Sequence, residues 1–344
     1  MRAMVVRRYG APEVFELRQM PDPQPKSGEV LIRVRTIGVN FADLLQRMGL
    51  HPGIPKPPFV PGLEIAGVVE KATESGRSAE GQPLRPGDAV TAFSQFNAYA
   101  EWVAVPASQV VRLPAGMPFE DAAAIPVNYL TAYHAIFTMG NLQPGDRILI
   151  HSAAGGVGIA AVQLARARGL VIFGTAGAEK QEYLRKIGVD HAIDYEKTDF
   201  VQAVQKFSPD GIEMVMDPIG GKSFTRSCEC LGSTGRLVVY GFSAAAGPDR
   251  KRNWMRAATA FLQTPRFHPL KLMRRNISVI GVNLSGLQSR GVLLRSELDE
   301  IFRLYAAGKI KPVIAKSFPL AQAAAAHQFV HDRKNIGKVI LTVK

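Results

Sequence analysis

The chain has 344 residues, 47% of them hydrophobic, and a formal net charge of +13 at pH 7. This length accommodates two domains, and the basic residues are scattered without a nucleic-acid-binding motif, so we expect no nucleic-acid partner. Its two cysteines, Cys228 and Cys230, are too close together for an ordinary structural disulfide and too few for a zinc site. With no secretory leader recognised, we expect a cytoplasmic protein with reduced thiols.

Residues 1–110 are predicted to form a β-rich unit. Short apolar runs alternate with Pro/Gly turns such as Pro86-Gly87-Asp88, and this pattern favours strands joined by sharp corners. The predicted strands are 30–34, 65–69, 89–93 and 102–105.

A different pattern, in which strands alternate with amphipathic helices, extends from about residue 126 to 284. Such alternation builds a parallel sheet with helices on both faces. We therefore predict an α/β fold centred on a Rossmann-type, doubly wound nucleotide-binding domain. The predicted strands are 147–152, 171–176, 192–195, 212–217, 236–242 and 278–284, and the predicted helices are 156–168, 179–187, 200–207 and 223–231.

The connection 243–277 is long and strongly basic. Within it, residues 250–275 hold eight Lys or Arg side chains and no acidic one, interleaved with aromatic residues. This mixture is typical of a helical insert that covers substrate or contacts a second copy, or of a segment that makes weak contact with an anionic membrane.

The last part of the chain returns to mixed structure. Helices are predicted over 294–307 and 320–331, and a final strand over 338–343. His327 and His331 lie four residues apart on the second helix, and without a third ligand nearby we expect a pair on the helix surface and no metal.

Three glycines directly follow the apolar strand 147–152, in the sequence Gly155-Gly156-Val157-Gly158. The N–H groups at the start of a helix have no internal partner, and together with the helix dipole they attract a phosphate. Gly155 and Gly156 leave room for a pyrophosphate, and Gly158 lets the helix pack against the strand. Because the loop follows a strand and opens a helix, it predicts dinucleotide binding.

The end of the second strand of this domain indicates which dinucleotide is bound. An NAD site usually carries Asp or Glu there, but this sequence continues through Gly177 to Lys180 without a carboxylate at the strand end. A missing carboxylate and an added lysine favour the 2′-phosphate of NADP. We therefore predict NADP (NADPH) as the cofactor, with Gly177, Lys180 and Tyr195 around its adenosine end.

Motifs spread along nearly the whole chain carry a family resemblance. They include Asn40-Phe41-Ala42-Asp43, Pro61-Gly62-Leu63-Glu64, Asn128-Tyr129-Leu130-Thr131, Asp217-Pro218-Ile219-Gly220-Gly221 and Gly337-Lys338-Val339. In these the chain resembles the medium-chain dehydrogenase/reductases, in their zinc-independent quinone oxidoreductase branch and near the vesicle amine transport protein 1 subgroup. The resemblance implies a GroES-like, β-rich substrate domain from residues 1–125 and 285–344 around a dinucleotide-binding domain at 126–284.

The same resemblance bears on metal binding. Metal-dependent members of the family hold a catalytic zinc with Cys and His, and this sequence has Asn40 and Leu63 at the matching positions. Neither side chain supplies the thiolate or imidazole that a tetrahedral zinc site uses. We therefore expect no zinc, and without that Lewis acid simple alcohol dehydrogenation is disfavoured.

The expected reaction is hydride transfer from NADPH to a quinone or an activated alkene such as an enone, in a site where the protein positions the cofactor. By resemblance, Asn40 is the catalytic residue and lies near the nicotinamide, although an Asn can also simply stabilise its own loop. We expect Asp43 to be structural and to hold Arg47, and we expect His51 and Tyr129 to lie at the cleft. The other cofactor-binding residues that it implies are Thr131, Gly220, Tyr240, Gly241, Phe242, Ser243, Val282, Asn283 and Leu284.

Two classes of function remain open at this point. One is the NADPH-dependent quinone or enone reductase, and the other is an NADPH-binding interaction or membrane-associated protein with little or no turnover. The family resemblance also implies a homodimer in which the sixth strand of each nucleotide-binding domain pairs with its counterpart.

Overall fold

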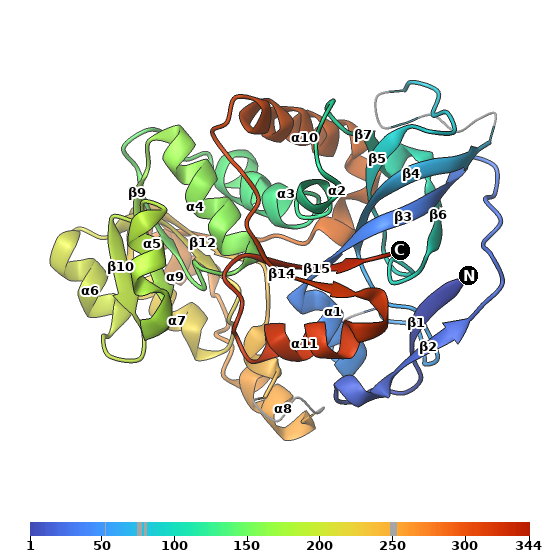
Figure 1. Ribbon diagram of the computed structural model, residues 1–344. Coiled ribbons are helices and arrows are strands. Elements are labelled where there is room, and N and C mark those ends of the chain that lie inside the picture. Colours follow the sequence, from blue (N-terminus) through green and yellow to red (C-terminus); the bar gives the residue numbers. More distant parts are fainter. Residues whose placement is uncertain (52, 74–77, 79–80, 248–252) are drawn as a thin grey trace.

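Two sheets lie side by side in the molecule (Figure 1). The structure is a computed structural model, and it describes residues 1–51, 53–73, 78, 81–247 and 253–344. Both ends of the chain belong to the part built around the seven-stranded sheet, and the middle of the chain builds the six-stranded sheet.

The six-stranded sheet is parallel throughout and runs in the order β10-β9-β8-β11-β12-β13. This is the order of a doubly wound dinucleotide-binding sheet, so the predicted fold class is confirmed. The direction of winding reverses between β8 and β11, and ligands of such sheets bind beyond the carboxyl ends of the strands at that point. The strands are β8 (Arg147–Ile150), β9 (Val171–Ala176), β10 (His191–Asp194), β11 (Ile212–Asp217), β12 (Leu231–Val239) and β13 (Ser278–Gly281).

Helices connect these strands and cover the sheet. Those between consecutive strands are α4 (Gly156–Arg168), α5 (Gln181–Lys186), α6 (Phe200–Phe207) and α7 (Lys222–Glu229), and α4 and α6 have the predicted bounds. α4 packs against α3 (Asn128–Tyr133), and α3 packs in turn against α10 (Gly291–Ala306). One buried hydrophobic cluster continues from this region to Ala66 and Val111, so the two halves of the molecule share part of their core.

The seven-stranded sheet has the order β14-β15-β3-β4-β5-β7, and β6 also pairs with β3. Its strands are β3 (Glu29–Val39), β4 (Glu64–Ala72), β5 (Ala89–Phe93), β6 (Trp102–Pro106), β7 (Val110–Arg112), β14 (Ile314–Pro319) and β15 (Lys338–Thr342). Because β15 pairs antiparallel with β3, the C-terminal segment becomes part of the N-terminal, GroES-like unit.

The remaining elements surround this second sheet. A separate hairpin consists of β1 (Arg2–Val6) and β2 (Phe15–Gln19), α1 (Phe41–Met48) follows β3 and packs against α11 (Ala323–His331), and α2 is Phe119–Ala122. Short helical turns are η1 (Pro12–Val14), η2 (Ala107–Gln109), η3 (His134–Met139), η4 (Ala178–Lys180), η5 (Ser243–Ala245), η6 (Leu284–Arg290) and η7 (Leu320–Gln322).

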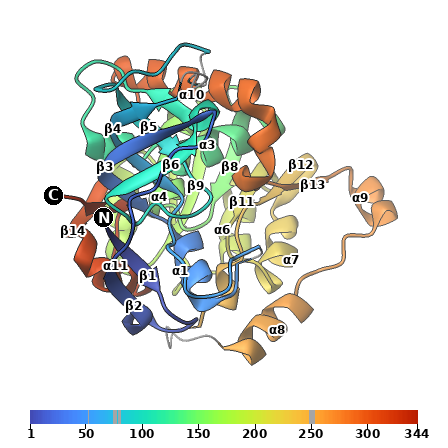
Figure 2. The same cartoon turned by 90° about the vertical axis from the view of Figure 1, so that its right-hand side faces the viewer.

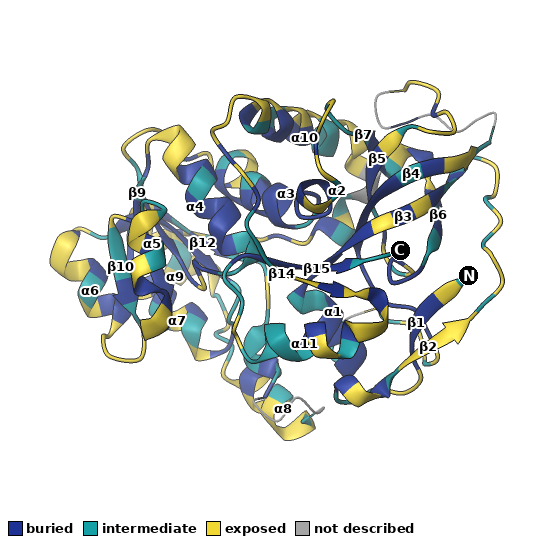
Figure 3. Ribbon diagram, in the orientation of Figure 1, coloured by how far each residue is buried: buried dark blue, intermediate teal, exposed yellow. Residues whose placement is uncertain are grey.

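The basic connection contains two helices, α8 (Trp254–Leu262) and α9 (Pro269–Arg275), which extend away from the sheets (Figure 2). Much of their apolar surface is exposed, as the yellow segments of α8 in Figure 3 show. Residues 250–252 of this basic segment lie outside the described residues. Within the described part of the chain, no helix has both the length and the apolar character to cross a membrane.

Candidate functional site

The glycine-rich loop connects β8 to α4 at the point where the sheet reverses its winding. Gly155 is the residue before the helix, and α4 then runs for 13 residues. A Cβ on Gly158 would lie 2.3 Å from the Ser152 carbonyl oxygen, and a Cβ on Gly156 would lie 2.4 Å from Asn128 Nδ2. Position 158 therefore requires glycine, because the clash there is with backbone, whereas at position 156 the space that a side chain would take is filled by the Asn128 amide. The start of the helix supplies N–H groups of the kind that bind a pyrophosphate.

A second contact fixes this loop from the other half of the molecule. Gly337 donates its N–H to the Ala154 carbonyl at 2.9 Å and pairs with Gly155 in a parallel bridge. Gly337 has φ +90°, and a Cβ there would lie 2.2 Å from the Val313 carbonyl oxygen, so only glycine fits. The segment that enters β15 therefore positions the loop.

Gly177, Lys180 and Tyr195 lie at the carboxyl ends of β9 and β10, where the adenosine end is predicted. The Lys180 side chain is mostly buried, and its ammonium donates to the backbone carbonyls of Arg333 and Asn335. Burial lowers the pKa of Lys180. The exposed Arg333 side chain donates to the Tyr195 hydroxyl at 3.3 Å, so the structure adds a cation that the sequence analysis missed.

The residues predicted to frame the nicotinamide follow the last two strands of the sheet. Tyr240 to Ser243 come after β12, and Val282 to Leu284 come after β13. Gly220 has φ +88°, and a Cβ on it would lie 2.3 Å from the Phe242 ring, which locates Phe242 directly against that turn. Thr131 is buried on α3, which packs against α4.

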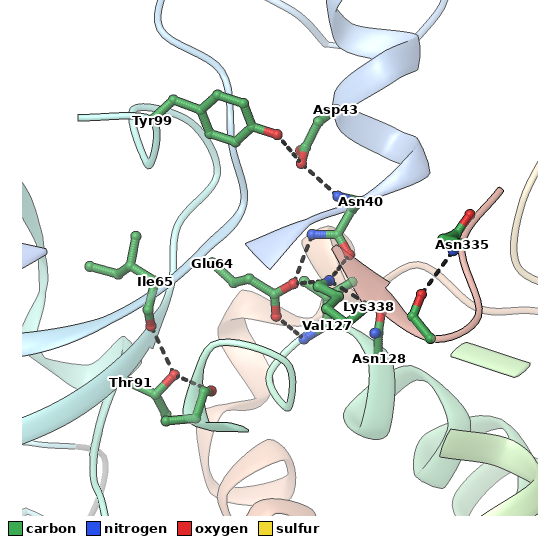
Figure 4. A network of polar contacts seen from close by, with 12 residues as sticks. Asn40, Asp43, Glu64, Ile65, Thr91, Tyr99, Val127, Asn128, Asn335 and Lys338 are labelled. Carbon is green, nitrogen blue, oxygen red and sulfur yellow. Dashed lines mark hydrogen bonds and ion pairs between the residues drawn. The ribbon is translucent and has the colours of Figure 1, made fainter. Parts of the chain in front are cut away.

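Asn40 is held in a buried polar network at the junction of the two halves (Figure 4). Its Nδ2 donates to Glu64 Oε1 at 2.8 Å, and its Oδ1 accepts from Lys338 Nζ at 2.6 Å. Lys338 also forms an ion pair with Glu64 and lies 3.4 Å from Asn128 Oδ1. Glu64 is fully buried, and its Oε2 accepts from the Val127 N–H at 2.8 Å. The charges of both buried ions are therefore paired and hydrogen-bonded, as burial requires.

A second buried cluster lies beside this network, under α1. Asp43 accepts from the Asn40 N–H at 2.8 Å and from the Tyr99 hydroxyl at 3.1 Å, and Tyr99 lies 2.9 Å from His327 Nε2. Burial raises the pKa of Asp43 to about 7 and lowers that of His327 well below its ordinary value.

This arrangement corrects two expectations from the sequence. His327 is fully buried, so it is not part of a helix-surface pair. Its ring packs edge-on against the ring of Tyr99. Asp43 is engaged by Asn40 and Tyr99, and Arg47 donates instead to the Gly10 carbonyl and to His327 Nδ1.

A pocket of about 270 Å³ opens between the two halves. Its lining comes from α1 and the segment after it, from Leu63, from the segment after β5, and from the residues that follow β13. His51 lines this pocket as expected. Tyr129 is buried, donates its hydroxyl to Gln163 Oε1 at 2.7 Å, and lines a smaller pocket at the junction together with Gly156 and Lys338. The lining residues are Gln46, His51, Gly53, Leu63, Gln95, Phe96, Asn283, Ser285 and Gly286.

The side chains at this junction do not form a zinc-type donor set. Asn40 offers a carboxamide that Glu64 and Lys338 already bind, and Leu63 offers only hydrocarbon. Among the described residues, no group of three or more His, Cys, Asp or Glu side chains is placed to hold a metal ion.

The doubly wound sheet, its glycine-lined loop and the adjoining β-rich unit together define the class of two-domain NAD(P)-dependent oxidoreductases. Comparison with known families agrees: residues 26–115 match the alcohol dehydrogenase GroES-like domain, and residues 187–341 match the zinc-binding dehydrogenase family. The chain belongs to the medium-chain dehydrogenase/reductases, in a group with quinone oxidoreductases and VAT-1 homologs.

Three relatives illustrate this membership. The human synaptic vesicle membrane protein VAT-1 homolog is 40% identical over 347 residues, covering 99% of this chain and 86% of that protein. Human quinone oxidoreductase is 31% identical over 354 residues, covering 99% of this chain and 97% of that protein. The structure of Escherichia coli quinone oxidoreductase complexed with NADPH matches with a TM-score of 0.88 at 28% identity, covering 100% of both chains.

Sequence reasoning missed Glu64, Lys338 and Arg333 as site residues. Glu64 and Lys338 were within the motifs that carried the family resemblance, but no role was assigned to them. A usable signal was present, because each is a single charge next to an apolar strand sequence, and a buried charge requires a partner. Arg333 offered no such signal.

Proposed function

We propose that this protein is an NADPH-dependent reductase that transfers hydride to a quinone or an activated alkene without zinc. The observation that carries the proposal is the geometry of the junction: the glycine-lined start of α4 and the pocket beside Asn283 both lie beyond the carboxyl ends of the strands of the parallel sheet. The relatives named quinone oxidoreductase, one of them solved with NADPH, support this assignment.

Each part of the cofactor has a proposed set of contacts. Gly155, Gly156, Val157 and Gly158 receive the pyrophosphate through backbone N–H groups. Thr131, Gly220, the segment 240–243 and the segment 282–284 surround the nicotinamide. When bound, the cofactor supplies the hydride, and the protein orients it and excludes water.

The 2′-phosphate is proposed to lie among Gly177, Lys180, Tyr195 and Arg333. The Lys180 ammonium is held against two backbone carbonyls, so the exposed Arg333 guanidinium beside Tyr195 adds the second cation. The exposed Glu179 carboxylate also lies here, 3.9 Å from Lys180 Nζ. With two cations beside this carboxylate, the remaining positive charge favours a 2′-phosphate over a ribose hydroxyl.

Asn40 is proposed to contact the substrate or the nicotinamide carboxamide. Its amide nitrogen has two hydrogens, and the Glu64 carboxylate accepts one of them. Lys338 at Oδ1 fixes which end of the amide is the nitrogen, so the second hydrogen has a defined direction. Zinc is not needed in this proposal, because hydrogen-bond donors stabilise the charge that develops on the acceptor.

The test is steady-state oxidation of NADPH and NADH with a panel of quinones and enones. We expect turnover with at least one acceptor and a kcat/KM for NADPH about tenfold or more above that for NADH, the size that 1.4 kcal/mol of extra phosphate binding provides. Negligible turnover with every acceptor, despite NADPH binding, would favour the alternative function of an NADPH-binding interaction protein.

That alternative draws on the exposed surface of α8 and α9. Trp254, Phe261 and Leu262 are each more than 60% exposed, and the described residues 253–276 contain five Lys or Arg and no acidic side chain. An exposed apolar and basic surface fits weak contact with an anionic membrane. Sedimentation with anionic liposomes tests this, and the absence of co-sedimentation at low salt would remove it.

A homodimer and a cytoplasmic location are also proposed. β13 is the edge strand of the six-stranded sheet, and its outer edge is open to pairing with a second copy. Light scattering coupled to size exclusion should give twice the chain mass. Cys228 and Cys230 are unpaired and buried, which fits a reducing compartment.

A further inference from the structure

Gln46 has a buried amide with an unsatisfied donor. The residue lies on α1 and is fully buried. Its Oε1 accepts a long hydrogen bond, 3.4 Å, from the Gly62 N–H, whereas its Nε2 has no hydrogen-bond partner among the described residues. The Gly62 contact orients the amide, since reversing it would place two donors against each other. A buried N–H without an acceptor destabilises the protein, and such a group in a native fold calls for an explanation.

The position of this amide supplies the explanation. Gln46 lines the pocket between the two halves, together with Asn283 and Ser285 of the segment that follows β13. That segment is where the proposed function locates the nicotinamide. A hydride acceptor bound in this pocket would therefore have both the nicotinamide and Gln46 among its neighbours.

We infer that Gln46 is a catalytic residue that donates from Nε2 to the carbonyl oxygen of the acceptor. This inference rests on the proposed function and assigns the acceptor's oxygen a partner. The balanced reaction for a quinone is NADPH + H⁺ + quinone → NADP⁺ + hydroquinone. The hydride adds two electrons to the acceptor, its oxygen gains negative charge, and a proton from water completes the product. A donor aimed at that oxygen binds most strongly as the charge develops.

The pocket also limits the acceptor's size. Its volume of about 270 Å³ is at the lower end of small-molecule sites, which are typically ~300–1,000 Å³. Leu63 and Phe96 supply apolar lining. The part of the acceptor held in the pocket is therefore inferred to be a compact ring carbonyl, such as the ring of a quinone or a cyclic enone.

The chain offers a matched pair of variants for the test. Gln46→Met replaces the amide with an unbranched apolar side chain of similar volume. Gln202→Met makes the same chemical change at an exposed position of α6, which is not part of the pocket lining. We expect Gln46→Met to lower kcat/KM for quinones by about 10- to 100-fold, at or below the loss of about 100- to 1,000-fold that follows removal of one oxyanion-hole donor. The KM for NADPH should stay within twofold, and Gln202→Met should change neither value by more than twofold.

A binding experiment separates this inference from the proposed function. The protein saturated with NADP⁺ is titrated calorimetrically with 2,3-dimethyl-1,4-naphthoquinone, which cannot be reduced there and is blocked against thiol addition. The control ligand, 2,3-dimethylnaphthalene, has the same rings without carbonyls. We expect Gln46→Met to weaken the quinone about fivefold, as for one neutral hydrogen bond, and to leave the hydrocarbon unchanged.

Each outcome then has one meaning. If the wild-type protein binds the quinone more tightly than Gln46→Met does but oxidises no NADPH with any acceptor, the proposed reductase function is refuted and the inferred contact of Gln46 is retained. Equal quinone affinity in wild type and Gln46→Met, equal weakening of quinone and hydrocarbon, or no quinone binding by the wild type would overturn the role of Gln46.

Discussion

The glycine-rich loop and the Asn40–Glu64–Lys338 network serve neighbouring parts of one site by opposite means. The loop depends on missing side chains: Gly156 and Gly158 lie in the first turn of α4, a few residues after β8 ends. The network depends on one amide and two charged side chains, Asn40, Glu64 and Lys338, whose pairwise separations in sequence are 24, 274 and 298 residues. The first is local and can be predicted from sequence, whereas the second exists only once β15 pairs with β3.

The two regions should also fail differently when they are changed. A buried ion pair that loses one partner leaves an uncompensated charge, so damage to the network should appear mainly as lost stability. A side chain added to the loop obstructs the phosphate path, so damage there should appear in cofactor affinity as well.

Lys338→Met is the change with the largest expected effect. It leaves the Glu64 carboxylate buried without its cation, and the free energy of unfolding should fall by about 3–5 kcal/mol in urea titrations. Lys334→Met is the matched control, because Lys334 is 64% exposed in its pair with Asp332. The control substitution should lower the free energy of unfolding by at most about 1 kcal/mol. A Lys338→Met variant as stable as the control would mean that the buried Lys338–Glu64 ion pair does not stabilise the fold.

The double variant Lys338→Met/Glu64→Gln sharpens this result. Removing both charges abolishes the buried ion, so part of the stability lost by Lys338→Met should return. A double variant less stable than Lys338→Met alone would show that Glu64 contributes mainly through Val127 and Asn40.

Asp43 makes the same region sensitive to pH. Burial raises its folded-state pKa from the ordinary 3.8 to about 7. Between about pH 4 and 7 the folded protein therefore holds a proton that the unfolded chain has released, so this contribution to stability is complete below pH 4 and is lost as the pH rises through 7. Relative to Asp43→Asn, the unfolding free energy of the wild type should fall by a few kcal/mol, about 4 at most, between pH 4 and pH 8. Parallel curves for the two proteins would contradict the assigned pKa.

Gly158→Ala tests the loop. The new Cβ would meet the backbone at Ser152 and Ala153, which cannot move aside as a side chain could. We expect a Kd for NADPH about tenfold higher or more by calorimetry, together with a lower melting temperature. Gly291→Ala is the control, since a Cβ there meets nothing within 4 Å among the described residues. Unchanged affinity in Gly158→Ala would mean that this turn does not form the phosphate site.

Arg333→Ala should have the smallest effect and concerns cofactor choice alone. Its guanidinium contacts Tyr195 at the surface, so removal should weaken NADPH about three- to tenfold and leave NADH within twofold. The neighbouring Lys334→Ala supplies the control. Equal weakening of both cofactors would place Arg333 outside the 2′-phosphate site.

Sequence patterns predicted the local features of this molecule well. α4, α6, β5, β9 and β11 have the predicted bounds, because each follows from a strong periodicity between clear turn signals. The glycine-rich loop could be recognised from sequence because a predicted strand precedes it and a predicted helix follows it. Among the missed elements, the β1–β2 hairpin and β14 depend on pairing with other segments. The helix α1 did have local signals, a capping box between Asn40 and Asp43 and a C-terminal Gly49, which the sequence interpretation did not use.

The same distinction between local patterns and distant partners applies to the residues of the candidate site. The turn at 155–158 between β8 and α4 could be predicted from sequence, because glycines mark places where the backbone needs room. Cofactor binding at these positions stays a prediction. The partners of Asn40, the burial of His327 and the unsatisfied amide of Gln46 could not be predicted, because they depend on which residues meet after folding. For Lys180 the residue was identified but not its contacts, which come from backbone atoms some 150 residues away.

Calorimetric titration of the purified protein with NADPH and with NADH tests the central claim most directly. The account predicts one site per chain, with NADPH bound about tenfold or more tightly than NADH because of the cations around its 2′-phosphate. No heat with either dinucleotide, or tighter binding of NADH, would contradict it.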